Sequence, residues 1–181
     1  MDRRLVILDR DGVINRESSA FVKSPAEWLP LPGSIEAIAA LSRAGFTVAV
    51  ASNQSGLARG LFDRSALRAM HRKLRRLVES AGGRVDRIEV CPHGPDDDCS
   101  CRKPKPGLIY RLARHFEVDP ADTTVIGDSL RDLQSAASAG ARPILVRTGN
   151  GRETERALGD ALAATPVFDN LAAAAAALTK A

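Results

Sequence analysis

The sequence predicts an α/β fold, namely a Rossmann-like, doubly wound parallel sheet with helices on both faces. Two observations support this prediction. Short apolar runs rich in Val and Ile are typical of strands buried inside a parallel sheet. Longer segments whose apolar residues recur at helical spacing separate these runs, and this alternation indicates parallel strands joined by right-handed crossovers.

The elements follow from this alternation in chain order. The apolar runs predict strands over residues 4–8, 47–51, 87–90, 123–127, 143–146 and 166–168. The helical spacing predicts helices over residues 34–45, 64–80, 107–117, 130–140 and 170–180. Gly45 and Gly140 stand where helix C-terminal caps favour a residue that tolerates positive φ. The alanine-rich last helix is expected to pack its small residues on the sheet.

The size and composition of the chain exclude several classes of protein. Its 181 residues fit a single domain, residues 1–181, because one domain takes about 100–200 residues. With 44% hydrophobic and 27% charged residues the chain is too balanced for disorder. The net charge is +4, and the basic residues are spread along the chain with acidic residues between them. This distribution argues against nucleic-acid partners, and acidic small molecules such as sugar phosphates remain possible ligands.

The sequence also bears on location and assembly. No apolar run approaches the roughly 18 residues of a membrane span, and the first residues lack the apolar core of a signal peptide. We therefore expect a cytoplasmic protein with no membrane partner. No large apolar surface is evident, which favours a monomer.

Two stretches interrupt the alternation. Residues 16–33 contain three prolines and the only Trp, and residues 91–107 contain four prolines and all three cysteines. Both follow predicted strands, and ligands in open α/β sheets bind outside the carboxyl ends of the strands. Both stretches should therefore border the site. They are too short to form a cap domain, so we expect a capless fold with an open site.

Two carboxylates follow the first strand, at Asp9 and Asp11, just before Gly12. Like charges at such close range raise one pKa or require a cation between them. One carboxylate of such a pair can be a nucleophile and metal ligand, and the other can be a general acid/base. The alternative is a β-turn with solvated Asp residues.

Two other strand ends carry polar groups. The second predicted strand runs into Ser52-Asn53-Gln54-Ser55, where a hydroxyl and backbone N–H groups can bind a phosphoryl oxygen. The fourth ends before Asp128, with Asp132 one turn up the next helix. Taken separately, the first could be an ordinary polar loop, and Asp128 could be a helix N-cap. They do not explain why three strand ends of one sheet carry an acid or a hydroxyl, and carboxylates here suit Mg²⁺.

The interrupting stretch 91–107 holds a second candidate metal site. All three cysteines lie within eleven residues, and an odd count argues against a disulfide framework. Four nitrogen and sulfur ligands suit a closed, tetrahedral structural Zn²⁺ site, and the segment offers Cys91, His93, Cys99 and Cys101. The alternative is three reduced thiols and a surface His. Zinc would orient Arg102 and Lys103, which follow directly. His71 and His115 fall in helical segments and are expected at the surface.

At four positions the sequence resembles the haloacid dehalogenase superfamily of phosphatases. The matching segments are DRDGVIN (9–15), SNQSG (52–56), RKPKPG (102–107) and GDSLRD (127–132). Within the superfamily, the string Cys-x-His…Cys-x-Cys-Arg-Lys-Pro resembles the phosphatases that act on heptose 1,7-bisphosphate. Histidinol-phosphate phosphatases share much of this pattern, so both subfamilies remain open.

The resemblance implies a role for each catalytic position. Asp9 would attack phosphorus and form an aspartyl-phosphate, and Asp11 would protonate the leaving oxygen and then activate water. Mg²⁺ would be held by Asp9, Asp128 and the backbone carbonyl of Asp11. Ser52 and Lys103 would hold the phosphoryl oxygens.

Substrate recognition is implied at a further set of positions: Glu17, Ser18, Ser19, Ala20, Asn53, Gln54, Ser55 and Arg102. Ser129 departs from those relatives that carry Lys at this position, so no role is assigned to it.

The expected function is Mg²⁺-dependent removal of the C7 phosphate from a heptose 1,7-bisphosphate, a step toward nucleotide-activated heptose and lipopolysaccharide cores. The alternatives are a histidinol-phosphate phosphatase or a broader phosphomonoesterase. A DNA 3′-phosphatase is disfavoured because there is no basic groove. A non-catalytic zinc-stabilised binding module is disfavoured because it has no use for Asp9, Asp11, Lys103 and Asp128 together.

Overall fold

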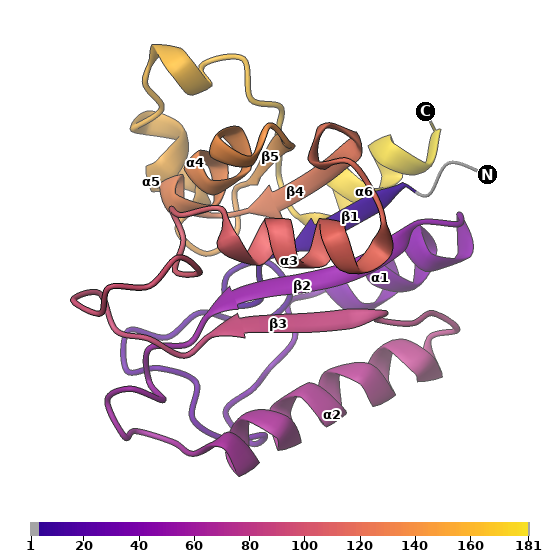
Figure 1. The fold of residues 1–181 in the computed structure, drawn as a ribbon. Coiled ribbons are helices and arrows are strands. Elements are labelled where there is room, and N and C mark those ends of the chain that lie inside the picture. The colour runs from indigo at the N-terminus through magenta and orange to yellow at the C-terminus, as the bar shows by residue number, and fades with distance from the viewer. Residues whose placement is uncertain (1–3, 181) are drawn as a thin grey trace.

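A computed structural model describes residues 4–180 and shows one six-stranded sheet in the order β3-β2-β1-β4-β5-β6 (Figure 1). Every strand pair is parallel. The strands are β1 (Leu5–Leu8), β2 (Thr47–Asn53), β3 (Arg87–Cys91), β4 (Thr123–Gly127), β5 (Arg142–Val146) and β6 (Val167–Phe168). The predicted α/β class and all six strands are thereby confirmed.

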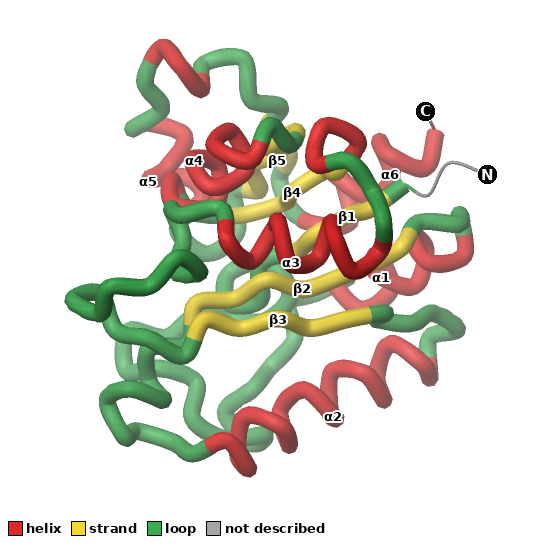
Figure 2. Tube along the Cα trace, viewed as in Figure 1, coloured by secondary structure: helices red, strands yellow, loops and turns green. Residues whose placement is uncertain are grey.

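Helices cover both faces of the sheet (Figure 2). The α-helices are α1 (Ser34–Arg43), α2 (Arg64–Ser80), α3 (Gly107–Phe116), α4 (Leu130–Ala139), α5 (Gly151–Arg156) and α6 (Leu171–Lys180). Two 3-10 turns, η1 (Pro120–Asp122) and η2 (Asp160–Leu162), precede β4 and β6.

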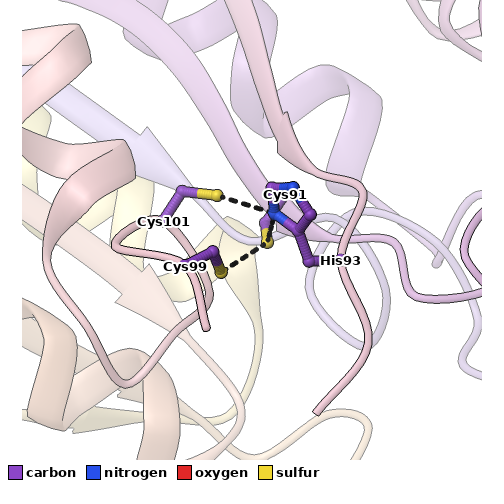
Figure 3. Close-up of side chains that lie close together, drawn as sticks. All are labelled: Cys91, His93, Cys99 and Cys101. Atoms are coloured by element: carbon purple, nitrogen blue, oxygen red, sulfur yellow. Dashed lines mark hydrogen bonds between the residues drawn. The ribbon is translucent and has the colours of Figure 1, made fainter. Parts of the chain in front are cut away.

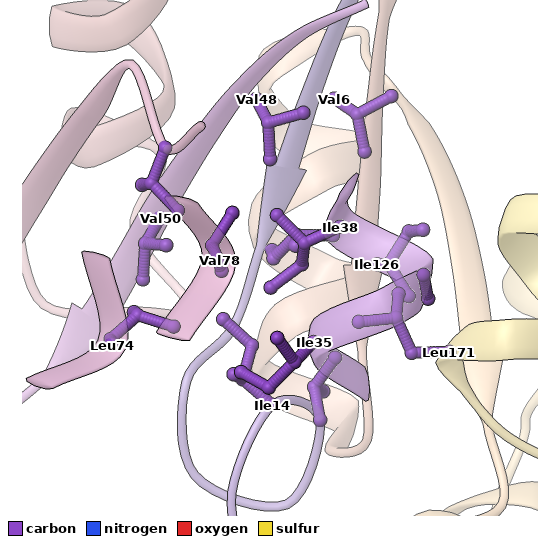
Figure 4. Packing of buried hydrophobic residues seen from close by; sticks show 14 of the residues in the cluster. Val6, Ile14, Ile35, Ile38, Val48, Val50, Leu74, Val78, Ile126 and Leu171 are labelled. Atoms are coloured by element: carbon purple, nitrogen blue, oxygen red, sulfur yellow. The ribbon is translucent and has the colours of Figure 1, made fainter. Parts of the chain in front are cut away.

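The central strand β1 shows why the fold is doubly wound. Its four residues are all buried, and successive side chains point to opposite faces. Val6 and Leu8 join a core with α1, α2 and α6, part of which Figure 4 shows. Leu5 and Ile7 join a second core with α3 and α4. Apolar side chains on both faces thus require helices on both sides of the sheet.

The last helix packs on α1 as well as on the sheet. Residues 170–180 were expected to pack on the sheet, and Leu171, Ala174 and Ala175 of α6 join the core on one of its faces. The largest contact of α6 is with α1, and it also contacts β5 and β6. A Cβ on Gly33, which precedes α1, would lie 3.6 Å from the Cβ of Ala172. The small side chain of Ala172 therefore lies close to the start of α1, while Ala174 and Ala175 are buried in the core.

The helix α5 was not predicted from the sequence. Its six residues, GRETER, are mostly polar, so they offer no apolar period. Among residues 4–180, none of the helices has both the length and the apolar character needed to cross a membrane.

Candidate active site

A cavity of about 340 Å³ opens at the carboxyl ends of the strands. Most residues predicted for the site line it, namely Asp9, Asp11, Glu17, Ser18, Ser19, Asn53, Gln54, Ser55, Arg102, Lys103 and Asp128. Ser52 and Ala20 do not. Ser52 is buried at the end of β2, where its Oγ accepts a hydrogen bond from Gln54. Ala20 is exposed in the loop after β1, and its carbonyl accepts a hydrogen bond from Lys23.

Lys103 is a buried cation that lines the cavity. Its Nζ donates to Asp9 Oδ1 at 2.8 Å, to Asp132 Oδ1 at 2.6 Å and to the Ala51 carbonyl at 2.9 Å. Burial alone would lower the pKa of Lys103, but the charges of Asp132 and Asp9 outweigh it and hold the pKa above its ordinary value. Lys103 is therefore a permanent positive charge beside Asp9.

Three carboxylates meet around this lysine. Oxygens of Asp9, Asp128 and Asp132 lie within 4.8 Å of one another. Burial raises the pKa of Asp9 to about 7; Asp132 adds to this shift and Lys103 opposes it. Burial also raises the pKa of Asp128 to about 8, with a further contribution from the charge of Asp9. A divalent cation fits here, because its charge would offset the cost of ionising neighbouring buried acids.

Asp132 serves a different purpose from its two neighbours. One oxygen accepts from Lys103, and the other accepts from the backbone N–H and the hydroxyl of Ser129, at 3.1 and 2.7 Å. Asp132 and Ser129 form the capping box that begins α4. Both oxygens of Asp132 are therefore engaged, which leaves Asp9 and Asp128 as the carboxylates available to a metal ion.

Two glycines make room for Asp128. Gly12 has a φ of 85° and Gly149 a φ of 56°, and a Cβ on either would overlap the Asp128 carboxylate. The loop after β5 also binds this carboxylate, since the Asn150 N–H donates to Oδ2 at 2.8 Å. Thr148 Oγ1 donates to the Gly12 carbonyl at 2.7 Å and joins the loops after β1 and β5. Substitution at either glycine would displace a proposed metal ligand.

The amide side chains of Asn53 and Gln54 are already engaged within the protein. Asn53 donates to the Lys103 carbonyl at 3.1 Å and accepts from the Lys103 N–H at 3.0 Å. Gln54 donates to Ser52 Oγ at 2.7 Å and to Asp11 Oδ2 at 3.0 Å. Both amides therefore bond to other residues predicted for the site, in addition to lining the cavity.

The side chains of the four predicted zinc ligands lie close together (Figure 3). Cys91 Sγ lies 3.5 Å from His93 Nδ1 and 3.8 Å from Cys99 Sγ, and Cys101 Sγ lies 3.4 Å from the same nitrogen. All four ligand atoms lie within 4.8 Å of one another. Two thiols are buried. This set of soft ligands fits a closed tetrahedral site for zinc.

The cysteine loop is joined to the catalytic cavity by Arg102. Its Nη1 donates to the carbonyl of His93 at 3.3 Å, and the residue lines the cavity. Lys103 is the next residue. The four-ligand cluster is thus followed directly by two residues that line the cavity.

Several residues at the cavity were missed by the sequence analysis. Phe21, Arg59, Arg131 and Asn150 all line it. Asn150 Nδ2 donates to Glu17 Oε2 at 2.6 Å, so this amide tethers the loop after β1. Asn150 follows β5, and the rule that strand ends carry the site could have found it. The sequence offers no comparable signal for Arg59 or Arg131.

The prediction for His71 was wrong in part. His115 is exposed as expected, but His71 is only partly exposed, and its Nε2 is buried without a hydrogen-bond partner in the described chain. Burial lowers the pKa of His71 to about 4, and the charges of Arg10 and Arg75 act in the same direction. His71 lies on the side of α2 that faces the core, where it is neutral.

Comparisons with known proteins agree with this geometry. A HAD-hydrolase-like family model matches residues 100–174. The D-glycero-beta-D-manno-heptose-1,7-bisphosphate 7-phosphatase of Bordetella bronchiseptica is 58% identical, covering 95% of this chain and 96% of that protein. The enzyme of the same name from Pseudomonas aeruginosa is 54% identical, with 98% and 99% covered.

Solved structures give the same result. The D,D-heptose 1,7-bisphosphate phosphatase of B. bronchiseptica, complexed with magnesium and phosphate, superposes with a TM-score of 0.94 at 55% identity and covers 98% of each chain. The corresponding structure from Burkholderia thailandensis has a TM-score of 0.77 at 46% identity, with 99% of this chain and 100% of that chain covered. This chain therefore belongs to the D-glycero-beta-D-manno-heptose-1,7-bisphosphate 7-phosphatase family, within the haloacid dehalogenase superfamily.

Proposed function

We propose that this protein is a Mg²⁺-dependent phosphatase that removes the C7 phosphate of D-glycero-D-manno-heptose 1,7-bisphosphate and releases heptose 1-phosphate. The observation that carries the proposal is the contact of Asp9 with Lys103 beside Asp11 and Asp128, in a chain of this family. The product is the precursor expected for nucleotide-activated heptose and lipopolysaccharide cores.

Asp9 is the proposed nucleophile. One of its carboxylate oxygens forms a bond to phosphorus while the bond from phosphorus to the C7 oxygen breaks, which yields an aspartyl-phosphate. Asp11 gives a proton to the departing oxygen. It then takes a proton from the water that attacks phosphorus, so that inorganic phosphate leaves and Asp9 is restored.

The cationic groups of the site stabilise the charge that spreads over the transferred phosphoryl oxygens. Lys103 supplies one fixed charge within reach of Asp9. Mg²⁺, held by Asp9, Asp128 and the backbone carbonyl of Asp11, supplies a second charge when it is bound. Ser52 donates its hydroxyl proton to a phosphoryl oxygen while its Oγ accepts from Gln54.

The C1 phosphate and the sugar hydroxyls of the bisphosphate contact the rim of the cavity. Three arginines line the same cavity as the catalytic carboxylates, namely Arg59, Arg102 and Arg131. Guanidinium groups bind phosphate through paired N–H donors. We assign the C1 phosphate to these arginines. The sugar hydroxyls would contact Glu17, Ser18, Ser19, the segment at Ala20, Asn53, Gln54 and Ser55.

We assign a structural Zn²⁺ to the four-ligand cluster, whose ligands are Cys91, His93, Cys99 and Cys101. Its closed ligand set leaves no position for chemistry. The metal would hold the loop from which Arg102 reaches the cavity and in which Lys103 follows.

We also propose a single-domain, monomeric, cytoplasmic enzyme. In support, one sheet runs through residues 5–168. The large hydrophobic side chains exposed among the described residues, Leu29, Leu61 and Tyr110, come from separate segments. Free thiols in a metal-binding arrangement fit a reducing compartment.

The test is phosphate release from both anomers of heptose 1,7-bisphosphate and from histidinol phosphate, with Mg²⁺. A large kcat/KM preference for the bisphosphate supports the proposal and identifies the anomer. A preference for histidinol phosphate would retain the same catalytic roles and reject the substrate. Comparable rates on all three would indicate a broader phosphomonoesterase.

A further inference from the structure

Arg10 lies between the two catalytic carboxylates in sequence and is completely buried, with an exposure of 0%. It donates from Nε and Nη2 to Asp11 Oδ1 at 3.1 and 3.0 Å, and from Nη2 to Asp11 Oδ2 at 3.1 Å. Nη2 also lies 3.2 Å from Gln54 Oε1. This guanidinium has no role in the sequence motifs or in the proposed chemistry.

Two amides complete the set of donors around Asp11. Asn15 Nδ2 donates to Oδ1 at 2.8 Å, and Gln54 Nε2 donates to Oδ2 at 3.0 Å. Each oxygen of the carboxylate therefore has at least one donor besides Nη2 of Arg10. Donors on both oxygens prevent the carboxylate from turning about its Cβ–Cγ bond. Its side chain is 28% exposed, and the exposed part faces the cavity that it lines.

A purely stabilising role explains Arg10 poorly. Burying an ion pair costs several kcal/mol per ion, and apolar residues of similar volume often stabilise a protein equally well. Nη1 of Arg10 is buried without a hydrogen-bond partner in the described part of the chain, which adds to this cost. Stability alone therefore does not explain why a guanidinium is buried at this position.

We propose that Arg10 and Gln54 are positioning residues that hold Asp11 in the orientation required for proton transfer to the leaving oxygen. Gln54 also bonds to Ser52 Oγ, so the same network joins the proton donor to the proposed phosphoryl site. This inference rests on the proposed role of Asp11. Misplacement of a catalytic group by about 1 Å can cost about 10²-fold in rate.

The experiment compares two leaving groups in Arg10→Met. Heptose 1,7-bisphosphate releases an alkyl oxygen that needs a proton, whereas p-nitrophenyl phosphate releases a stabilised aryl oxygen that does not. We expect kcat for the bisphosphate to fall by at least about 30-fold, with little change in KM. The rate on p-nitrophenyl phosphate should change far less. Arg10→Lys, which keeps a donor, should restore part of the loss.

Two comparisons separate positioning from structure. In an Asp11→Asn background, Arg10→Met should cause little further loss, because the group that it positions is gone. The control is Arg75→Met, which removes a partly buried arginine whose Nη1 donates to the Val85 carbonyl, away from the cavity. It should leave both rates unchanged.

Equal losses on the two substrates, or losses that add fully to those of Asp11→Asn, would overturn the inference. If Arg10→Met fails to fold, Asn15→Leu removes another donor to Asp11 at a residue that does not line the cavity, and it provides the same contrast without removing the charge. Activity of the wild type on the bisphosphate is measured first. Its absence would reject the proposed substrate, and phenyl phosphate would then replace the bisphosphate as the poor leaving group.

Discussion

The ammonium of Lys103 lies 2.8 Å from a carboxylate oxygen of Asp9, although 94 positions separate the two residues in sequence. The second anchor of Lys103 is Asp132 on α4, at 2.6 Å. The cation therefore joins the end of β1 to the first turn of α4 and lies beside the proposed nucleophile. Its own loop begins at the cysteine cluster, so this cluster is connected along the chain to the cavity.

Asp9→Asn should abolish turnover, because an amide cannot form the aspartyl-phosphate. We expect kcat to fall by at least about 10³-fold. Phosphate release measures the loss, and binding of inorganic phosphate, followed by calorimetry, should persist because Lys103 and the rim arginines remain. Hydrolysis at a rate near that of the wild type would refute the assignment of Asp9 as nucleophile.

The stability of the protein without Mg²⁺ should fall as pH rises. The folded-state pKa values of Asp9 and Asp128, about 7 and about 8, exceed the ordinary value of 3.8. The protonated forms therefore favour folding, and this contribution is complete below pH 3.8 and is lost as pH rises through about 7 and 8. Because Mg²⁺ competes with these protons, its stabilising effect should grow toward pH 8.

Urea unfolding at pH 5, 6.5 and 8, with and without Mg²⁺, measures both effects. Asp128→Asn is the matched control, and in this variant the pH slope and the Mg²⁺ effect should both decrease. A Mg²⁺ effect of the same size at all three values of pH would contradict the assignment of these two acids as the metal site.

Removal of zinc should impair catalysis through Arg102 and Lys103. Protein prepared without added metal should contain one zinc per chain by elemental analysis. Cys101→Ser or chelation should lower both thermal stability and kcat/KM, since the loop that carries Arg102 loses its fixed geometry. Ser100→Ala, in the same loop but outside the ligand set, is the control. Absence of zinc from the purified protein would count against the site.

Arg131→Ala should weaken binding of the bisphosphate more than its turnover. Arg131 is exposed at the rim of the cavity and has no hydrogen bond or ion pair within residues 4–180. Loss of a charge-assisted contact to the C1 phosphate should raise KM about 10-fold. The KM for a sugar monophosphate should stay the same, and an equal rise for both substrates would exclude a role in recognising the second phosphate.

His71 should destabilise the protein in acid. Its folded-state pKa of about 4 lies below the ordinary value of 6.5. Between these two values of pH, His71 is protonated in the unfolded chain and neutral in the folded chain. This contribution is complete above pH 6.5 and is lost as pH falls toward 4. The stability of the wild type relative to His71→Gln should therefore decrease over this interval of pH in urea unfolding. A constant difference would show that His71 does not titrate in this way.

The sequence by itself determined the fold class, the strand order along the chain and most of the candidate site. These features depend on local patterns: apolar runs for the strands, helical spacing for the helices, and polar groups at three strand ends. Parallel strands bring their carboxyl ends to one edge, so Asp9, Asn53 and Asp128 meet there for a topological reason.

Only the tertiary structure decided how each side chain is used. The family resemblance implied substrate contacts for Asn53 and Gln54, and both line the cavity. The fold adds hydrogen bonds from their amides to Lys103, Ser52 and Asp11, which the sequence did not predict. Arg10 had no predicted role, and its importance follows from its complete burial against Asp11. Hydrogen-bond partners and burial depend on contacts between residues far apart in the chain, and a local pattern contains no information about them.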